Sequence, residues 1–84
     1  MNSITLVGKI RGSLDAKTRL VEVNRPSGDS NIDPISIPLR HWTREEKTLL
    51  STLKDGTFVI VRGRLDHDNK IGLYAVAEHI SIIK

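Results

Sequence analysis

The arginines and the single tryptophan of this sequence are the residues whose chemistry points to a binding partner. A cationic side chain that contacts a phosphate adds affinity and salt dependence but reads no base sequence. An exposed tryptophan ring can stack on a nucleobase, which contributes about 1–3 kcal/mol per base. Together these residue types favour a nucleic-acid-binding surface. The candidate binding residues are Lys9, Arg11, Arg25, Arg40, Trp42, Arg44, Arg62 and Arg64.

Each of these assignments has a structural alternative. The net charge of +3 is compatible with a phosphate-bearing partner but does not require one. For any single arginine the alternative is a solvated position on the surface. For Trp42 the alternative is packing over the first turn of the helix that follows it. The grouping of the cationic residues, rather than any one of them, favours nucleic acid.

Other chemistries lack the residues that they need. The sequence has no cysteine, which excludes a disulfide scaffold, a thiolate zinc site and a cysteine nucleophile. His41, His67 and His79 are spread over three predicted elements, so they do not form a metal site. No serine has the spacing of a nucleophile elbow, and no glycine-rich phosphate loop precedes a helix. We therefore expect a protein that is not an enzyme and that needs no metal or cofactor.

The length and composition limit the architecture. A chain of 84 residues has room for one domain, which we expect to span residues 1–84. No apolar run has the length of a membrane helix, and residues 1–12 do not have the pattern of a signal peptide. We expect a cytoplasmic, nucleoid-associated protein or its organellar equivalent, and not a secreted one.

Alternating apolar and polar residues predict five strands, over residues 3–11, 19–25, 34–42, 57–65 and 72–83. Their inward faces should carry Ile4, Leu6, Gly8 and Ile10 in the first strand, Ile35, Ile37 and Leu39 in the third, and Val59, Val61, Gly63 and Leu65 in the fourth. Gly8 indicates a bend or a close approach of two backbones. Pro38 places its strand at an edge or at a bulge. Residues 26–33 should form a loop, and residues 66–70 a hairpin turn.

One helix is predicted between the third and fourth strands. Thr43 and Glu46 have the spacing of a capping box, in which each side chain accepts a hydrogen bond from a backbone N–H of the first turn. Leu49, Leu50 and Leu53 would then form one apolar stripe. Gly56 suits the left-handed position just past the end of the helix.

Phe58 and Ile60 are predicted on the outward face of the fourth strand, next to Arg62 and Arg64. Exposed apolar pairs on a small domain are typical of an interface. A helix or loop that covers them is the alternative. We expect a subunit interface here, because a small core gains stability from the additional buried area.

Five strands with one helix between the third and fourth is the element order of an OB-fold barrel, an all-β class. The sequence also resembles the bacterial-type single-stranded DNA-binding protein (SSB) family over nearly its whole length. The resemblance rests on Leu6-Val7-Gly8-Lys9-Ile10, on Val23-Asn24-Arg25, on the ungapped stretch from Trp42-Thr43-Arg44 through Leu53-Lys54-Asp55-Gly56-Thr57 to Leu65, and on Ala77-Glu78-His79-Ile80. The resemblance implies binding of single-stranded DNA without sequence preference in DNA replication and repair. It also implies a homo-oligomer, with a tetramer favoured over a dimer.

The sequence departs from the family pattern in ways that leave alternatives open. Ser36 and Lys70 stand where the family presents further aromatic residues for base stacking, and Ile37 replaces a common histidine. The family's acidic tip, which recruits replication and repair proteins, is missing, so we expect a short variant without recruitment of that kind. One alternative is a primosome-like replication accessory protein, and another is a protein-interaction OB module that has lost strong DNA binding. RNA in place of DNA is also left open.

Overall fold

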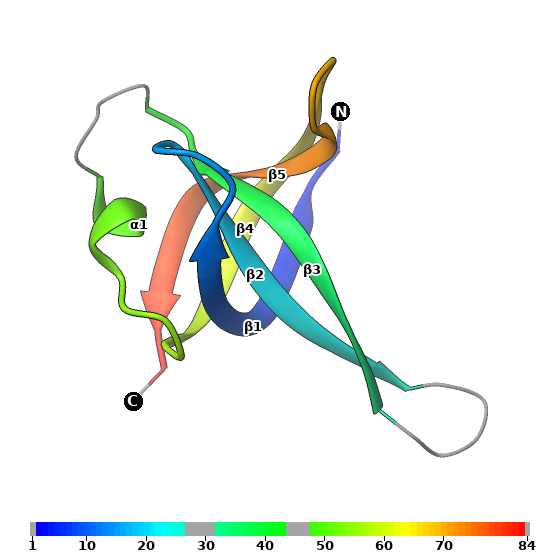
Figure 1. Ribbon diagram of the computed structural model, residues 1–84, viewed down its shortest axis with the longest axis vertical. Coiled ribbons are helices and arrows are strands. Elements are labelled where there is room, and N and C mark those ends of the chain that lie inside the picture. Colours follow the sequence, from blue (N-terminus) through cyan, green and yellow to red (C-terminus); the bar gives the residue numbers. More distant parts are fainter. Residues whose placement is uncertain (1, 27–31, 44–47, 84) are drawn as a thin grey trace.

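The computed structural model describes residues 2–26, 32–43 and 48–83, apart from the side chains of residues 25, 26 and 32. Within these residues five strands form a closed barrel in the order β1-β2-β3-β5-β4 (Figure 1). The elements are β1 (Ile4–Ser13), β2 (Thr18–Pro26), β3 (Ile32–His41), α1 (Leu49–Thr52), β4 (Phe58–Asp68) and β5 (Gly72–Ile82). The chain is therefore an OB-fold, as its sequence predicts.

The barrel closes through one short parallel pairing. Residues 39–41 of β3 pair with residues 75–77 of β5, whereas the other neighbouring strands are antiparallel. The earlier part of β3 pairs only with β2, and Pro38 lies opposite Leu20 there. In Figure 1 this part of the β2–β3 hairpin extends away from the barrel. Pro38 is thus on an edge segment, where a missing N–H is tolerated, and the prediction from Pro38 is confirmed.

The core is made by the inward faces of the strands together with two leucines around α1. It contains Ile10, Val21, Leu39, Leu50, Leu53, Val59, Val61, Ala75 and Ala77. Two residues predicted to face inward do not belong to it, since Ile35 is 38% and Leu65 is 41% exposed. Ile35 lies in the protruding part of the β2–β3 hairpin, and β1 pairs with β4 only up to Gly63. The alternation places both residues on the inward side of their strands, but the barrel does not extend to the positions at which they lie.

Two glycines mark places where backbones come very close. A Cβ at Gly8 would clash with the carbonyl of Glu22 on β2, which confirms the predicted close approach. A Cβ at Gly63 would clash with the carbonyl of Val76, beside the register shift between β4 and β5. Both glycines therefore allow strand spacings that a side chain would prevent.

The helix differs from its prediction. The described helix has Thr48 as its N-cap, and its capping box pairs Thr48 with Ser51. The predicted capping box depended on Glu46, which lies outside the described residues. Leu49 is 47% exposed, so the apolar stripe consists of Leu50 and Leu53 alone. A helix of one turn can bury only the residues that point directly at the barrel.

Two predicted turns also need correction. Gly56 has a positive φ, as predicted, with a value of 92°. However, it does not directly follow the helix, whose C-cap is Leu53. It lies in a separate turn in which the Thr57 N–H donates to the Lys54 carbonyl at 3.1 Å. The β4–β5 turn is shorter than predicted, because Asp66 pairs with Tyr74 in the ladder and β4 continues to Asp68. The left-handed residue at this turn is Gly72. The polar residues at the end of the β4–β5 hairpin can continue the strand because the hairpin end is exposed to solvent.

A buried arginine ties the helix and the β1–β2 connection to the barrel. Arg19 is 8% exposed, and its guanidinium donates to the carbonyls of Gly12 (2.9 Å), Leu50 (3.0 Å) and Leu53 (2.7 Å). It also pairs with the Asp55 carboxylate at 2.9 Å. These bonds give the Leu53 carbonyl a donor, and they give the Leu50 carbonyl a second donor besides the Leu53 N–H at 3.4 Å. Arg19 therefore has a structural role, although its residue type alone would suit phosphate binding.

Candidate nucleic-acid interface

A cleft of about 800 Å³ lies on the outer side of the barrel over β3, β5 and β4. Its floor is a row across three strands, in which Val76 of β5 is paired with Arg40 on one side and Arg64 on the other. The loop at residues 14–17 and the end of β4 border the cleft. In OB-folds, the loops that join strands 1 and 2 and strands 4 and 5 commonly flank the ligand.

Trp42 lies at the edge of this cleft with its ring largely free. Its side chain is 59% exposed, and its backbone N–H donates to the Ala77 carbonyl at 3.0 Å. The His41 ring lies beside it, with centroids 6.1 Å apart and planes tilted by 32°. The backbone bond fixes the position of Trp42 while most of its ring remains accessible. This arrangement suits stacking on a base.

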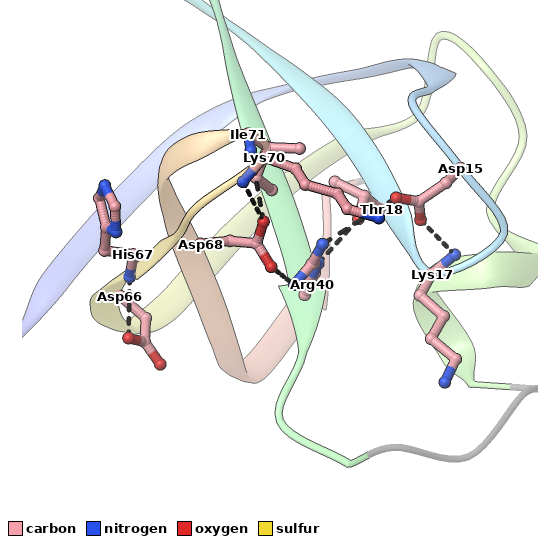
Figure 2. A network of polar contacts seen from close by, with 9 residues as sticks. All are labelled: Asp15, Lys17, Thr18, Arg40, Asp66, His67, Asp68, Lys70 and Ile71. Carbon is pink, nitrogen blue, oxygen red and sulfur yellow. Dashed lines mark hydrogen bonds and ion pairs between the residues drawn. The ribbon is translucent and has the colours of Figure 1, made fainter.

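Arg40 has polar partners on both sides of the cleft (Figure 2). Its Nε donates to the Thr18 hydroxyl at 2.8 Å, Nη1 lies 3.3 Å from an Asp68 oxygen, and Nη2 lies 3.9 Å from an Asp15 oxygen. Its guanidinium carbon is 4.7 Å from the centroid of the Tyr74 ring. Arg40 thus joins the β1–β2 loop to the β4–β5 hairpin across the cleft.

The carboxylates that face Arg40 are held by their own loops. The backbone N–H of Lys17 lowers the pKa of Asp15, and Thr18 and Arg40 add to this effect against the opposing effect of burial. The backbone N–H of Lys70 lowers the pKa of Asp68, with further contributions from Ile71 and Arg40. Both groups are therefore ionised at neutral pH. The charged lining consists of Lys17, Arg19, Arg40 and Arg64 against Asp15, Asp66 and Asp68.

The two arginines of β4, Arg62 and Arg64, line different hollows of the surface. Arg64 lines the cleft and forms an ion pair with Glu78 at 3.4 Å. Arg62 lines a smaller hollow of about 340 Å³ together with Thr5 and His79. The register shift between Arg62 and Gly63 separates the two positions along the ladder. Neighbouring positions on one strand face therefore contribute to adjacent, distinct parts of the surface.

Lys9 and Arg11 are not brought to the cleft. The Lys9 ammonium lies 5.5 Å from the Phe58 ring centroid, and Arg11 forms an ion pair with Glu22 at 3.8 Å. Both residues belong to the part of β1 that pairs with β2 or with the start of β4. Arg44 and the side chain of Arg25 lie outside the described residues. Of the predicted binding residues, the structure gathers Arg40, Trp42 and Arg64 in one cleft.

Phe58 and Ile60 belong to an outer apolar face formed by Val7, Phe58, Ile60 and Ile83. Val7 is paired with Ile60, and the Ile83 N–H donates to the Phe58 carbonyl at 2.9 Å. Val7, Phe58 and Ile83 are 54%, 51% and 44% exposed, respectively. No element among the described residues covers this face, so it is accessible to another chain.

Sequence reasoning missed Tyr74 and the two aspartates that hold Arg40. Tyr74 is half-buried in the cleft and supports the guanidinium of Arg40. Its position just after the fourth-to-fifth strand turn was the available signal, because that turn flanks the ligand in OB-folds. Nothing in the sequence indicates that Asp15 and Asp68 meet on one arginine.

The described part of the chain has neither a metal-binding cluster nor a membrane-spanning helix. It contains no group of three or more His, Cys, Asp or Glu residues that could hold a metal ion. None of the helices described there has the length and apolarity to cross a membrane. The site is thus defined by arginines, aromatic rings and carboxylates.

A closed five-stranded barrel with these bordering loops defines an OB-fold protein. No protein-family model matches the chain, and no curated protein matches its sequence. Among solved structures, it is similar to the dimeric N-terminal domain of PriB protein from Thermoanaerobacter tencongensis, with a TM-score of 0.57 and 25% identity over 99% of this chain and 97% of that one. It is also similar in fold to the mitochondrial single-stranded DNA-binding protein from S. cerevisiae, with a TM-score of 0.65 and 15% identity over 99% of this chain and 94% of that one. Both likenesses span nearly the whole chain and agree with the OB-fold of its barrel.

Proposed function

We propose that this protein binds single-stranded DNA without sequence preference, as an SSB-like OB-fold protein of DNA replication and repair. The observation that carries the proposal is the exposed Trp42 ring beside Arg40 and Arg64 in one cleft of the barrel. One base would stack on Trp42 while phosphates contact the arginines and Lys17. Neither contact distinguishes one base from another, which accounts for binding without sequence preference.

A second candidate is a primosome-like replication accessory protein. It is favoured by the likeness to the PriB domain, which covers nearly all of both chains. Both candidates bind single-stranded DNA through the cleft, so they differ in partners rather than in the residues of the site. A co-sedimentation assay of the protein with primosome proteins on single-stranded DNA separates them, because only the accessory role needs a complex with those proteins.

We also propose that the outer apolar face joins copies of this chain into a homo-oligomer. The exposed Val7, Phe58 and Ile83 side chains would be buried on assembly. The dimeric PriB domain supports a dimer, and the resemblance to the SSB family favours a tetramer. An oligomer of single OB domains would act in the cytoplasm or in an organelle, wherever the chain meets single-stranded DNA.

The proposed function is tested by salt-dependent binding of a labelled dT oligomer, followed by anisotropy. For single strands, the slope of log K against log salt is about −0.7 per phosphate contact. The Lys17→Gln, Arg64→Gln double variant should therefore have a slope that is smaller in magnitude by about 1.4. The Lys9→Gln, Arg11→Gln pair removes the same charge from β1 and is the matched control. Its slope should equal that of the unmodified protein. Equal losses from both pairs would contradict binding in the cleft, and no complex at low salt would favour the protein-interaction module.

A further inference from the structure

The guanidinium of Arg40 is oriented from two sides in the free protein. Its guanidinium carbon lies over the Tyr74 ring, 4.7 Å from the ring centroid, and the hydroxyl of the fully buried Thr18 accepts from Nε at 2.8 Å. These two contacts fix the plane and the direction of the group. They leave Nη1 and Nη2 directed at the space between the two loops, where both face carboxylates.

Carboxylates fill the position that a phosphate would take on such a group. Arginine presents paired donors that bind carboxylate and phosphate oxygens in the same geometry. Here Asp68 lies 3.3 Å from Nη1, and Asp15 lies 3.9 Å from Nη2. Figure 2 shows the two aspartates approaching Arg40 from opposite loops. A phosphate of a bound strand would compete with both of them for the same donors.

The loops hold these carboxylates in place independently of Arg40. Asp15 Oδ1 accepts from the Lys17 N–H at 2.8 Å. Asp68 Oδ1 accepts from the N–H groups of Lys70 (2.7 Å) and Ile71 (3.3 Å). In both aspartates the other oxygen, Oδ2, is the one that faces Arg40. The backbone hydrogen bonds thus hold both carboxylates beside Arg40, where they compete with a phosphate.

We propose that Arg40 is an oriented phosphate-binding residue whose site the protein itself blocks. Asp68 binds Nη1, and Asp15 forms a longer ion pair with Nη2, so that the β1–β2 loop and the end of β4 stay linked until a strand phosphate displaces both carboxylates. This inference rests on the proposed function of the cleft. Tyr74 and Thr18 act as positioning residues that keep the guanidinium in place during the exchange. Partly exposed ion pairs are individually weak, so the exchange is accessible to a strand that makes several contacts at once. An isolated phosphate lacks those additional contacts, and the closed state therefore selects for a polymer.

The experiment compares aspartate-to-asparagine variants, because asparagine keeps the Oδ1 acceptor of each aspartate and replaces the charged Oδ2 that faces Arg40 by a neutral NH2 group. We expect Asp68→Asn and Asp15→Asn each to tighten binding of the labelled dT oligomer about two- to five-fold, the range of one partly exposed ion pair. Asp66→Asn is the matched control. Asp66 lines the same cleft, and its Oδ1 accepts from the His67 N–H at 2.8 Å, but it has no ion pair with Arg40 among the described residues. Asp66→Asn should change the affinity less than either variant.

A second measurement separates failure of this inference from failure of the proposed function. Inorganic phosphate is titrated into the protein while the NMR signal of the Arg40 Nε–H is followed. We expect phosphate to shift this signal in the Asp15→Asn, Asp68→Asn double variant and to leave it in place in the unmodified protein. If phosphate shifts the signal only in the double variant, but neither the unmodified protein nor any variant binds the oligomer, the proposed function is wrong. The inference that Asp15 and Asp68 block Arg40 would still hold.

The inference itself is overturned by either of two results. One is an oligomer affinity that rises equally in all three asparagine variants, since that would be a general effect of charge. The other is a phosphate response of Arg40 that is the same with and without the two aspartates. Circular dichroism and a urea midpoint for each variant establish that the compared proteins are folded.

Discussion

Replacing Trp42 by alanine separates a stacking residue from a packing residue, and the structure sets the size of each effect. Trp42 is 59% exposed, so 41% (100 − 59) of its surface is covered. For a tryptophan of about 250 Å² this is about 100 Å², or at most about 2.5 kcal/mol at 25 cal/mol per Å². A fully buried tryptophan would lose about 3–5 kcal/mol on the same change. The bond from the Trp42 N–H to Ala77 is retained, because it belongs to the backbone.

The effect on binding should be separate from this small loss of stability. Removing one stacked base contact weakens binding by about 1–3 kcal/mol, which is a factor of about 5 to 150. The slope of log K against log salt should not change, because stacking releases no counterions. The assay is an anisotropy titration of labelled dT oligomer at several salt concentrations, with a urea midpoint measured on the same preparation.

Leu73→Ala is the matched control for Trp42→Ala. Leu73 is 65% exposed on β5 but does not line the cleft, so its removal should leave DNA affinity unchanged. The reasoning would be refuted by a Trp42→Ala protein with a sharply lowered urea midpoint and normal affinity per folded molecule. In that case Trp42 would be a structural residue.

Four further predictions follow from buried, charged and tightly packed positions. Arg19→Ala should lower the free energy of unfolding in urea by about 1–3 kcal/mol, because the buried Leu53 carbonyl loses its donor while the Leu50 carbonyl keeps the Leu53 N–H; an unchanged midpoint would contradict this. Asp15 and Asp68 have a lowered pKa in the folded state, so the stability that they contribute is complete above their ordinary pKa of 3.8 and is lost as the pH falls through the folded values. The urea midpoint should therefore decrease once the pH is lowered below about 4. This decrease should be smaller in the Asp68→Asn variant. Gly63→Ala should lower the thermal midpoint by forcing a Cβ against the Val76 carbonyl, with a loss of at least about 1–3 kcal/mol. If the proposed homo-oligomer forms through the outer apolar face, Phe58→Glu should convert it to monomers in light scattering while the far-UV circular dichroism of the barrel persists.

Much of the fold can be predicted from local pattern alone. The alternation of residues 3–11 places Ile10 inward and Val7 outward, and the structure agrees because a strand has a period of two. Pro38 and Gly8 indicate an edge segment and a close backbone approach, and both are present. These features depend on the backbone chemistry of single residues, which is why the sequence reveals them.

The extent of the elements is less accessible from sequence. Ile35 and Leu65 continue the inward alternation of their strands, yet both lie where a strand runs past its neighbours and are exposed. Leu49 follows the helical period but points away from the barrel, since the described helix is only one turn long. Period identifies the side of an element on which a residue lies. It does not show where the neighbouring element ends.

For the site, the sequence by itself determines the residue types, which are a group of arginines and one tryptophan. Only the tertiary structure decides what each arginine contacts. Arg19 is buried against the end of α1, Arg40 is held between two loops, and Arg64 lines the cleft, although all three have the same side chain. The reason is that barrel closure brings together segments far apart in the chain. Asp15 and Asp68 meet at Arg40 through cross-strand pairing, and no local spacing encodes that meeting.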